Sequence, residues 1–227
     1  LHYTGLKAWD AAGEVLDARM EPADGGLTVV VDATDAAYPV TVDPSVGSWS
    51  FVSGQNQAHL GHTVASAGDV NGDGFDDVLV TAPYYDNGQV DEGRVWLFHG
   101  SAEGLGSEPE WTFESNQDYV YLASEEFDEH CGIAGNADFN GDGYADIAVG
   151  AKYYDKGQTN EGVVFVFYGS ADGFSESADW IGESNQANAY YGVCVEAIDT
   201  DGDGYSDLVV GSPRYDNGHT DDNGRLS

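Results

Sequence analysis

The sequence is poor in basic residues and has no long apolar run. Only 7 Lys and Arg stand against 41 Asp and Glu, which gives a formal net charge of -34. A chain this acidic repels the phosphates of nucleic acids and anionic membrane surfaces, so we expect no nucleic-acid partner. No apolar stretch reaches the ~18 residues that a transmembrane helix requires, and we expect no membrane insertion.

Sulfur-containing residues are also scarce. The chain has 2 cysteines, Cys131 and Cys194, which are too few for a disulfide framework and match no zinc-binding spacing. They could pair if neighbouring repeats bring them together, but two buried thiols are the favoured interpretation. Neither a starting Met nor a signal sequence precedes Leu1, as expected of a processed or excerpted piece.

Glycine and aromatic residues are plentiful instead. The sequence has 31 Gly, 14 Tyr, 9 Phe and 5 Trp. Glycine supplies the positive φ of tight turns, and aromatic side chains fill pleated surfaces. We therefore expect short aromatic strands joined by tight turns, with hardly any helix.

A nine-residue, aspartate-rich pattern occurs three times. The copies are Asp69-Val-Asn-Gly-Asp-Gly-Phe-Asp-Asp77, Asp138-Phe-Asn-Gly-Asp-Gly-Tyr-Ala-Asp146 and Asp199-Thr-Asp-Gly-Asp-Gly-Tyr-Ser-Asp207. Each copy is followed by an apolar, strand-like run. Internal repetition at this period indicates a solenoid, a propeller or an array of repeats.

Other segments repeat in step with the aspartate pattern. Motifs of the form Tyr-Tyr-Asp or Arg-Tyr-Asp begin at Tyr84, Tyr153 and Arg214. Segments that open on tryptophan begin at Trp49, Trp111 and Trp180. The tryptophans are 62 and then 69 residues apart, and the surplus falls around residues 119–130. Loops accommodate such an insertion at little energetic cost.

Each repeat contains about four predicted strands. In the first repeat these are His62–Ala67, Asp77–Ala82, Arg94–His99 and Glu110–Glu114. A four-stranded sheet per repeat is what a β-propeller blade requires, whereas helical repeats need helical spacing and a β-sandwich does not repeat its loops so closely. The predicted fold is therefore all-β, with about three blades of a β-propeller preceded by a small β-rich N-terminal segment.

The aspartate loops predict three Ca²⁺ sites. In D-x-[DN]-x-D-G-x-x-D, the side chains at positions 1, 3, 5 and 9 converge because the glycine at position 6 permits a sharp turn, and position 7 presents its carbonyl. Oxygen ligands in this number suit Ca²⁺, whereas Mg²⁺ retains water and Zn²⁺ prefers nitrogen or sulfur. The predicted ligands are Asp69, Asn71, Asp73, Phe75, Asp77, Asp138, Asn140, Asp142, Tyr144, Asp146, Asp199, Asp201, Asp203, Tyr205 and Asp207.

Two rival interpretations of these loops are less favoured. An EF-hand or dockerin loop has a carboxylate at position 12, where this chain has Val80, Val149 and Val210. Simple Asx turns use the same residue types, but the recurrence of a full ligand pattern favours metal binding. Without a cation, each pair of carboxylates would repel by about 3 kcal/mol at about 5 Å. We therefore expect Ca²⁺ binding to be coupled to folding.

The repeats resemble the FG-GAP repeat of integrin α subunits and of many bacterial secreted proteins. The resemblance covers Trp49 to the end and rests on residues 61–77, on Thr81-Ala-Pro83 where the family has Gly-Ala-Pro, and on Gly150-Ala-Lys152 and Gly211-Ser-Pro213. It implies a seven-bladed propeller with structural Ca²⁺ between the first two strands of several blades. It also implies adhesion or ligand binding without a chemical reaction.

Two segments are predicted along the chain. Residues 1–47 form a β-rich lead-in with strands at Val15–Met20, Leu27–Val31 and Tyr38–Val42, and Asp43-Pro44 ends it. Residues 48–227 form the partial propeller, with units 49–110, 111–179 and a truncated 180–227. We expect a fragment whose remaining blades belong to the same longer protein or come from other chains.

These observations favour an extracellular Ca²⁺-binding module, secreted or on the cell surface, that binds a protein or glycan ligand and is not an enzyme. The Tyr-Tyr-Asp motifs are either ligand contacts or packing between blades. One alternative is the scaffold domain of a secreted enzyme that cleaves polysaccharides or phosphodiesters, with His59, His62, His99 or His130 as acid or base. Another is a structural protomer of a head-to-tail surface assembly.

Overall fold

The computed structural model describes residues 6–23, 26–32, 34–38, 40–44, 49–124, 132–218 and 224–227. The chain divides into two compact units, residues 1–50 with 102–104, and residues 51–101 with 105–227. Every regular secondary-structure element in the described ranges is a β-strand. Accordingly, these ranges contain no helix that is long and apolar enough to cross a membrane.

The N-terminal unit contains two small antiparallel sheets. One has the order β2 (Val15–Leu16), β1 (Leu6–Trp9), β5 (Thr41–Pro44), and the other pairs β3 (Ala18–Ala23) with β4 (Gly26–Val31). Pro44 ends the edge strand β5 opposite Leu6, a place where a missing N–H donor is tolerated. The sequence pattern predicted strands in this segment but not β1.

The C-terminal unit contains three antiparallel sheets with the same plan. The first consists of β6 (Val64–Gly68), β7 (Asp77–Ala82), β8 (Arg94–Phe98) and β9 (Trp111–Glu114). The second consists of β10 (Ile133–Ala137), β11 (Asp146–Ala151), β12 (Val163–Phe167) and β13 (Trp180–Glu183). The third consists of β14 (Cys194–Ile198), β15 (Asp207–Ser212) and β16 (Arg225–Leu226).

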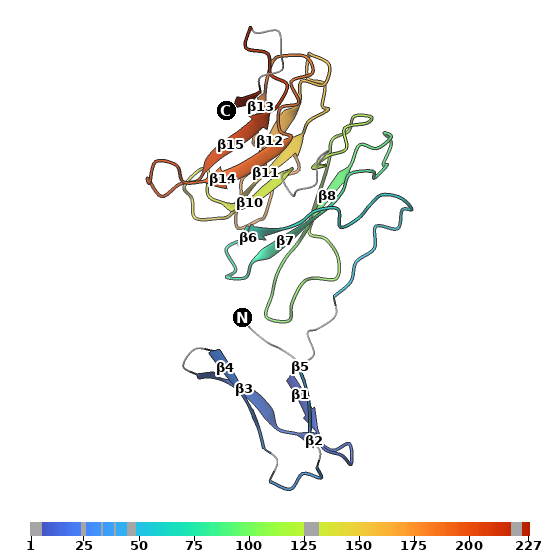
Figure 1. Ribbon diagram of the computed structural model, residues 1–227, viewed down its shortest axis with the longest axis vertical. Helices are drawn as coiled ribbons and strands as arrows, with labels where there is room; N and C mark the ends of the chain where they lie inside the picture. Colours follow the sequence, from blue (N-terminus) through green and yellow to red (C-terminus); the bar gives the residue numbers. More distant parts are fainter. Residues whose placement is uncertain are drawn as a thin grey trace. The chain divides into compact units, whose positions relative to one another are not determined.

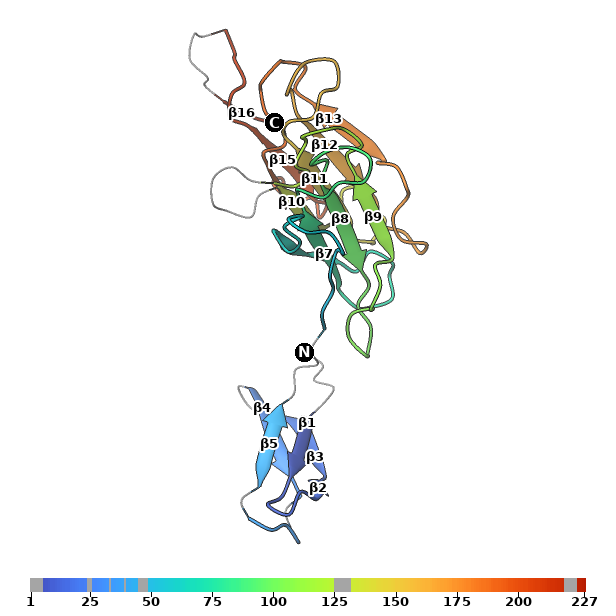
Figure 2. The ribbon, with the colours of Figure 1, turned by 90° about the vertical axis from the view of Figure 1, so that its right-hand side faces the viewer.

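Each of these sheets is an up-and-down meander in which consecutive strands are neighbours. The first strand of the second sheet, β10, lies between the first strands of the other two sheets, β6 and β14. The three sheets therefore follow one another in chain order (Figures 1 and 2). This arrangement of two four-stranded antiparallel sheets and a third sheet with three described strands confirms the predicted blades. The four strands predicted in the first repeat agree with β6 to β9 to within two residues at either end.

The core follows from the alternation of side chains along each strand. In the first sheet, Leu79 and Leu97 belong to a cluster shared with the second sheet, whereas Val80 and Trp96 pack in a separate cluster on the opposite face. Another cluster joins the second and third sheets through residues such as Val164. The sheets are therefore held together by apolar contacts between neighbouring faces.

Several sequence predictions fall wholly or partly outside the described residues, among them the role of His130 as an acid or base. Cys194 is partly buried in β14, but Cys131 is not among the described residues, so the state of both thiols stays a prediction. The insertion expected around residues 119–130 is described only as far as Ser124. In that part, the N–H groups of Tyr119 and Tyr121 donate to carbonyls of the first sheet's 90–91 turn, at 2.7 and 3.0 Å.

Candidate metal centres

The three aspartate loops occupy equivalent places, each between the first and second strands of a sheet. Residues 69–77 connect β6 to β7, residues 138–146 connect β10 to β11, and residues 199–207 connect β14 to β15. Position 9 is the first residue of the second strand, and position 12 lies inside that strand. The loops are therefore flanked by strands, unlike the helix-flanked loop of an EF-hand.

The carboxylate at position 1 closes the turn of each loop. Asp69 accepts hydrogen bonds from the N–H groups of Asp73 at 3.0 Å and Gly74 at 2.8 Å. Asp138 and Asp199 accept from the glycines at positions 4 and 6 of their own loops, at 2.7 to 3.2 Å. The glycine at position 6 has φ between 88° and 93° in the three loops, as the predicted sharp turn requires.

The side chains at positions 3 and 5 turn toward the same loop. In the first loop, Asn71 Oδ1 accepts from the Asp73 N–H at 3.0 Å, and Asp73 Oδ1 accepts from the Phe75 N–H at 2.9 Å. The second and third loops repeat both bonds at 2.9 to 3.1 Å. These bonds hold two predicted ligand side chains of each loop in position by using backbone donors of the loop itself.

The third loop has an aspartate at all four predicted side-chain ligand positions. The ligand oxygens of Asp199, Asp201 and Asp207 lie within 4.8 Å of one another, and all three residues are exposed. No other three His, Cys, Asp or Glu side chains in the described ranges come as close together. In the first two loops, an asparagine at position 3 replaces one carboxylate and donates to the aspartate at position 5, at 3.1 and 2.9 Å.

Position 9 anchors the first two loops to their sheets. Asp77 Oδ2 accepts from the Val70 N–H at 3.0 Å, and its Oδ1 accepts from the Gly100 N–H, just after β8, at 2.9 Å. Asp146 makes the same two bonds with Phe139 and Gly169, at 2.7 and 2.8 Å. Both aspartates are fully buried.

The surroundings of position 9 shift its acidity in different directions. Burial raises the pKa of Asp146 to about 6 against the opposing effect of its two backbone bonds, and the other aspartates of the loop raise the pKa further. Burial also raises the pKa of Asp77. In the third loop, the Thr200 hydroxyl and N–H bond to the exposed Asp207 and hold its pKa below the usual range. A buried carboxylate beside other acids gains from a bound cation, which favours its ionised form.

The residues present fit a hard divalent cation. Each loop offers only carboxylate, amide and backbone carbonyl oxygens, and each carboxylate oxygen has a second lone pair beyond its backbone bond. The sequence did not reveal two anchoring donors, Gly100 and Gly169, although the Gly-Ser pair that repeats after the third strand is a signal for them. It also did not reveal that His99 Nδ1 lies 3.4 Å from Asn71 Nδ2.

A row of tyrosines crosses from one sheet to the next. The ring centroids of Tyr84 and Tyr121 are 5.2 Å apart, those of Tyr121 and Tyr153 are 5.9 Å apart, and those of Tyr153 and Tyr190 are 5.2 Å apart. The Arg214 guanidinium lies 4.6 Å from the centre of the Tyr190 ring. Tyr84 is nevertheless 40% exposed. The row thus contributes packing between blades and also presents aromatic surface.

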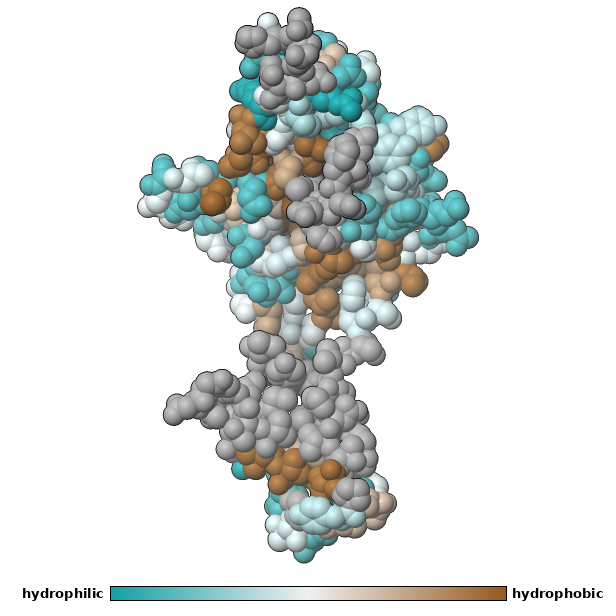
Figure 3. Space-filling view, in the orientation of Figure 1, coloured by the Kyte–Doolittle hydropathy of each residue, from teal (hydrophilic) through white to brown (hydrophobic). Residues whose placement is uncertain are grey.

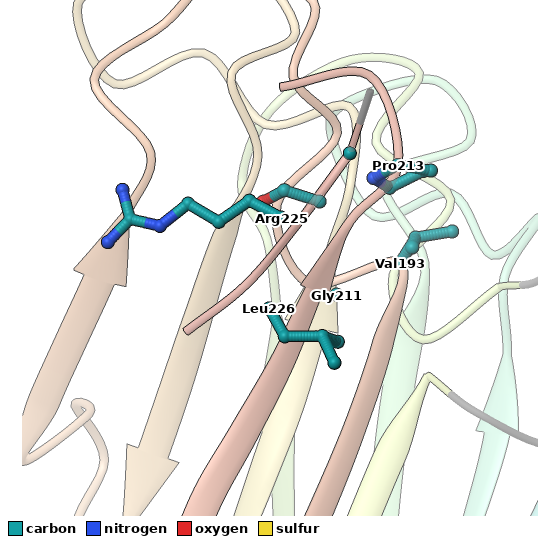
Figure 4. Close-up of a pocket in the computed structure, with 7 residues that line it drawn as sticks. Val193, Gly211, Pro213, Arg225 and Leu226 are labelled. Atoms are coloured by element: carbon teal, nitrogen blue, oxygen red, sulfur yellow. The ribbon is translucent and has the colours of Figure 1, made fainter. Parts of the chain in front are cut away.

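A recess of about 390 Å³ lies at the edge of the third sheet (Figure 4). It is lined by Val193, Gly211, Ser212, Pro213, Gly224, Arg225 and Leu226. The Arg225 side chain extends away from Val193 and Pro213 in Figure 4, and the lining contains no histidine, cysteine or carboxylate. The apolar surface of the face shown in Figure 3 is broken into patches by hydrophilic residues. Among the described residues, therefore, the lining offers no histidine, cysteine or carboxylate for acid–base chemistry.

Comparison with known families agrees with this geometry. The FG-GAP repeat family matches residues 60–98, 133–167 and 195–227. These ranges include all three aspartate loops and the first three strands of each sheet apart from Cys194, but not the fourth strands β9 and β13. The chain therefore carries three FG-GAP repeats, which fold as antiparallel sheets of the propeller-blade type, and the three sheets formed by the described residues do not close into a ring.

Particular relatives include both integrin α chains and a phospholipase. The chain is 35% identical over 169 residues to the phosphatidylinositol-glycan-specific phospholipase D of Mus musculus, which covers 73% of this chain and 20% of that protein. It is 37% identical over 166 residues to integrin alpha-PS2 of Drosophila melanogaster (68% of this chain, 11% of the relative). It is 36% identical over 166 residues to integrin alpha-IIb of Mus musculus (70% and 15%). The chain thus spans a fifth or less of the length of these relatives.

Proposed function

We propose that this chain is a Ca²⁺-binding propeller module of an extracellular protein, secreted or on the cell surface, that binds a protein or glycan ligand. In this proposal each described blade holds one structural Ca²⁺ in its aspartate loop. The observation that carries the proposal is the convergence of Asp199, Asp201 and Asp207, whose ligand oxygens lie within 4.8 Å of one another. Such a group of carboxylates repels itself unless a cation neutralises it.

The chain's own residues would supply most of the coordination. The carboxylate or amide oxygens at positions 1, 3, 5 and 9 and the carbonyl at position 7 would hold the ion, and Ca²⁺ would supply charge neutralisation without redox chemistry. The backbone bonds that fix these side chains lower the cost of organising the site. Because an unfolded chain lacks this organisation, binding would stabilise the folded protein.

Calorimetric titration of metal-depleted protein with Ca²⁺ tests this proposal. We expect three bound ions and a melting temperature that rises with free Ca²⁺ and falls again on chelation. The variant Asp199→Asn should lose or weaken one ion, because position 1 is an aspartate in all three loops, whereas Asp172→Asn, at an exposed aspartate outside the loops, should bind as the wild type does. A melting temperature that is indifferent to chelator would contradict the proposal.

The exposed part of the tyrosine row is the favoured surface for a ligand. Aromatic rings offer large, rigid contact area to both protein and sugar partners. Binding of the wild type should be screened on arrays of glycans and of extracellular proteins, and Tyr84→Ala should weaken a specific interaction. Tyr38→Ala changes an exposed tyrosine of the N-terminal unit and should leave that binding unchanged.

A second candidate function is a propeller scaffold within a secreted enzyme that cleaves phosphodiesters or polysaccharides. The resemblance to a protein named phosphatidylinositol-glycan-specific phospholipase D favours it. Against it, the His59 ring packs against the Tyr84 ring in a tilted arrangement, with centroids 4.6 Å apart, and the residues that match His59 in the other repeats are not histidines. Turnover of phosphodiester or polysaccharide substrates that is lost in His59→Ala, His62→Ala or His99→Ala would support the enzyme.

A third candidate is a head-to-tail surface assembly, in which the blades of one chain cover the free faces of the next. Light scattering with and without Ca²⁺ separates it from a single binding module. Growth of large species only when Ca²⁺ is present would favour assembly, and a constant monomer mass would favour the module.

A further inference from the structure

Neighbouring aspartate loops touch one another through the aromatic ring at position 7. A Cβ atom added to Gly72, at position 4 of the first loop, would lie only 2.7 Å from Cε1 of Tyr144, at position 7 of the second loop. Gly141 and Tyr205 repeat this contact between the second and third loops. Each tyrosine ring therefore lies directly against the backbone of the preceding loop, and only glycine leaves room for it.

A backbone hydrogen bond accompanies each ring contact. The Ala145 N–H donates to the Asp69 carbonyl at 3.0 Å, and the Ser206 N–H donates to the Asp138 carbonyl at 2.8 Å. Ala145 lies between positions 7 and 9 of the second loop, both predicted ligands, while Asp69 is position 1 of the first loop. The ring contact thus starts at one predicted ligand residue, Tyr144, and the hydrogen bond ends at another, Asp69, while Gly72 and Ala145 are their neighbours in the two loops.

From this repeated geometry we propose that Tyr144 and Tyr205 are positioning residues that couple neighbouring cation sites. The inference rests on the proposed function, since it requires Ca²⁺ in the loops. An ion in the second loop fixes the carbonyl of Tyr144, and with it the ring and the neighbouring N–H that contact the first loop. The first loop is then held in its binding geometry before its own ion arrives. By reciprocity, an ion in the first loop favours binding in the second.

The coupling predicts cooperative binding of Ca²⁺ to the wild type. Once one ion is bound, the neighbouring site should bind about 5-fold or more tightly than an independent site would. Because the predicted ligand at position 7 is the backbone carbonyl, Tyr144→Ala removes the ring while it retains every proposed ligand. This variant should bind the same number of ions with reduced cooperativity, and Tyr144→Phe, which keeps the ring, should restore it.

Phe75 provides a matched control for the loss of a ring. It occupies position 7 of the first loop, and a Cβ on Gly100, after β8, would lie 3.2 Å from its Cβ atom, so its neighbours belong to its own sheet. Phe75→Ala should therefore leave cooperativity between the first and second sites unchanged, in contrast to Tyr144→Ala. Calorimetric titration with Ca²⁺ alone measures all four proteins. Equal cooperativity in Tyr144→Ala and the wild type would overturn the coupling.

A glycine series gives a second readout that does not depend on metal. Gly72, Gly141 and Gly202 all occupy position 4 with φ of 73°, 77° and 80°, but a Cβ on Gly202 would meet nothing within 4 Å. Alanine at each of the three positions carries similar backbone strain. A larger fall in melting temperature for Gly72→Ala and Gly141→Ala than for Gly202→Ala therefore reports the ring contact. The double variant Gly72→Ala/Tyr144→Ala should recover part of that fall.

The outcomes distinguish this inference from the proposed function. If wild-type protein binds no Ca²⁺, the proposed sites fail and the coupling fails with them. If it binds several ions independently, the sites stand and the coupling alone is overturned. If Gly72→Ala does not fold, the comparison of Tyr144→Ala with Tyr144→Phe still decides, because neither adds an atom to a crowded position.

Discussion

Gln117 and Asp155 are joined by a pair of opposed hydrogen bonds. Gln117 Nε2 donates to the Asp155 carbonyl at 3.1 Å, and the Asp155 N–H donates to Gln117 Oε1 at 2.7 Å. The glutamine follows β9 of the first sheet, and the aspartate follows β11 of the second. The same pair recurs at Gln55 with Asp86 and at Gln186 with Asp216.

Replacement of Gln117 by leucine should loosen the contact between the first two sheets. The change removes both hydrogen bonds of a partly exposed pair, and we expect a loss of about 1–2 kcal/mol in the free energy of unfolding. Urea denaturation measures it. Gln158→Leu, which alters an exposed glutamine for which no such pair exists, should cost less than half as much, and equal losses would show that the paired bonds contribute nothing.

Trp111 and Trp180 are repeat counterparts with different burial, which makes them a natural comparison. Trp111 is 9% exposed, and its Nε1 donates to the Ser175 carbonyl at 2.8 Å, whereas Trp180 is 44% exposed. Trp111→Ala should cost about 3–5 kcal/mol because it leaves a cavity between two sheets. Trp180→Ala should cost about 1 kcal/mol. Chemical denaturation of both variants in excess Ca²⁺ checks the order, and a reversed order would contradict the packing.

Gly135 marks a close approach of the inner strands β6 and β10. A Cβ on this residue would collide with the Ser66 carbonyl oxygen and would lie 3.1 Å from Cα of Ala67. Gly135→Ala should therefore lower the free energy of unfolding by about 1–3 kcal/mol. At Gly106 the nearest atom to such a Cβ would be 3.5 Å away. Gly106→Ala should be neutral or stabilising by up to about 1 kcal/mol, and thermal melts of both proteins test the contrast.

Glu92 gives the fold a pH dependence that is separate from the metal loops. Burial raises the pKa of its carboxyl group, and the nearby Glu114 charge raises it further against the bond from the Asn87 N–H. Because the folded state holds this proton more tightly than the unfolded chain does, the group contributes most stability below its ordinary pKa of 4.5. That contribution is lost as the pH rises through the folded-state pKa.

The variant Glu92→Gln should remove this titration. We expect the difference in melting temperature, variant minus wild type, to rise as the pH increases from about 4 and then to level off, because only the wild type loses the Glu92 contribution. Glu176→Gln, at an exposed carboxylate, should give a flat difference over the same range. A flat difference for Glu92→Gln as well would show that burial does not perturb this group.

The repeat pattern was enough to predict the blades and the positions of the loops. Strand positions such as Asp77–Ala82 were predictable because alternation and turn residues are local properties, and three copies reinforce one another. The identity of the ions stays a prediction. Contacts such as Gln117 with Asp155 were not predictable, because they join residues 38 apart whose relative placement depends on how one sheet packs on the next. The burial of Asp146 likewise arises from that packing.

The repeat in the sequence and the repeat in the sheets are out of phase by one strand. A sequence unit opens at Trp111, but that residue begins the strand that completes the preceding sheet, and the Gln117 that follows reaches forward to Asp155. A recombination junction placed just before each tryptophan would keep each glutamine of the Gln117–Asp155 type in the same unit as its aspartate partner. The preceding sheet would then receive its fourth strand from the unit that follows the junction. Duplication or deletion of whole units at these junctions would therefore lengthen or shorten the array without creating an unmatched boundary.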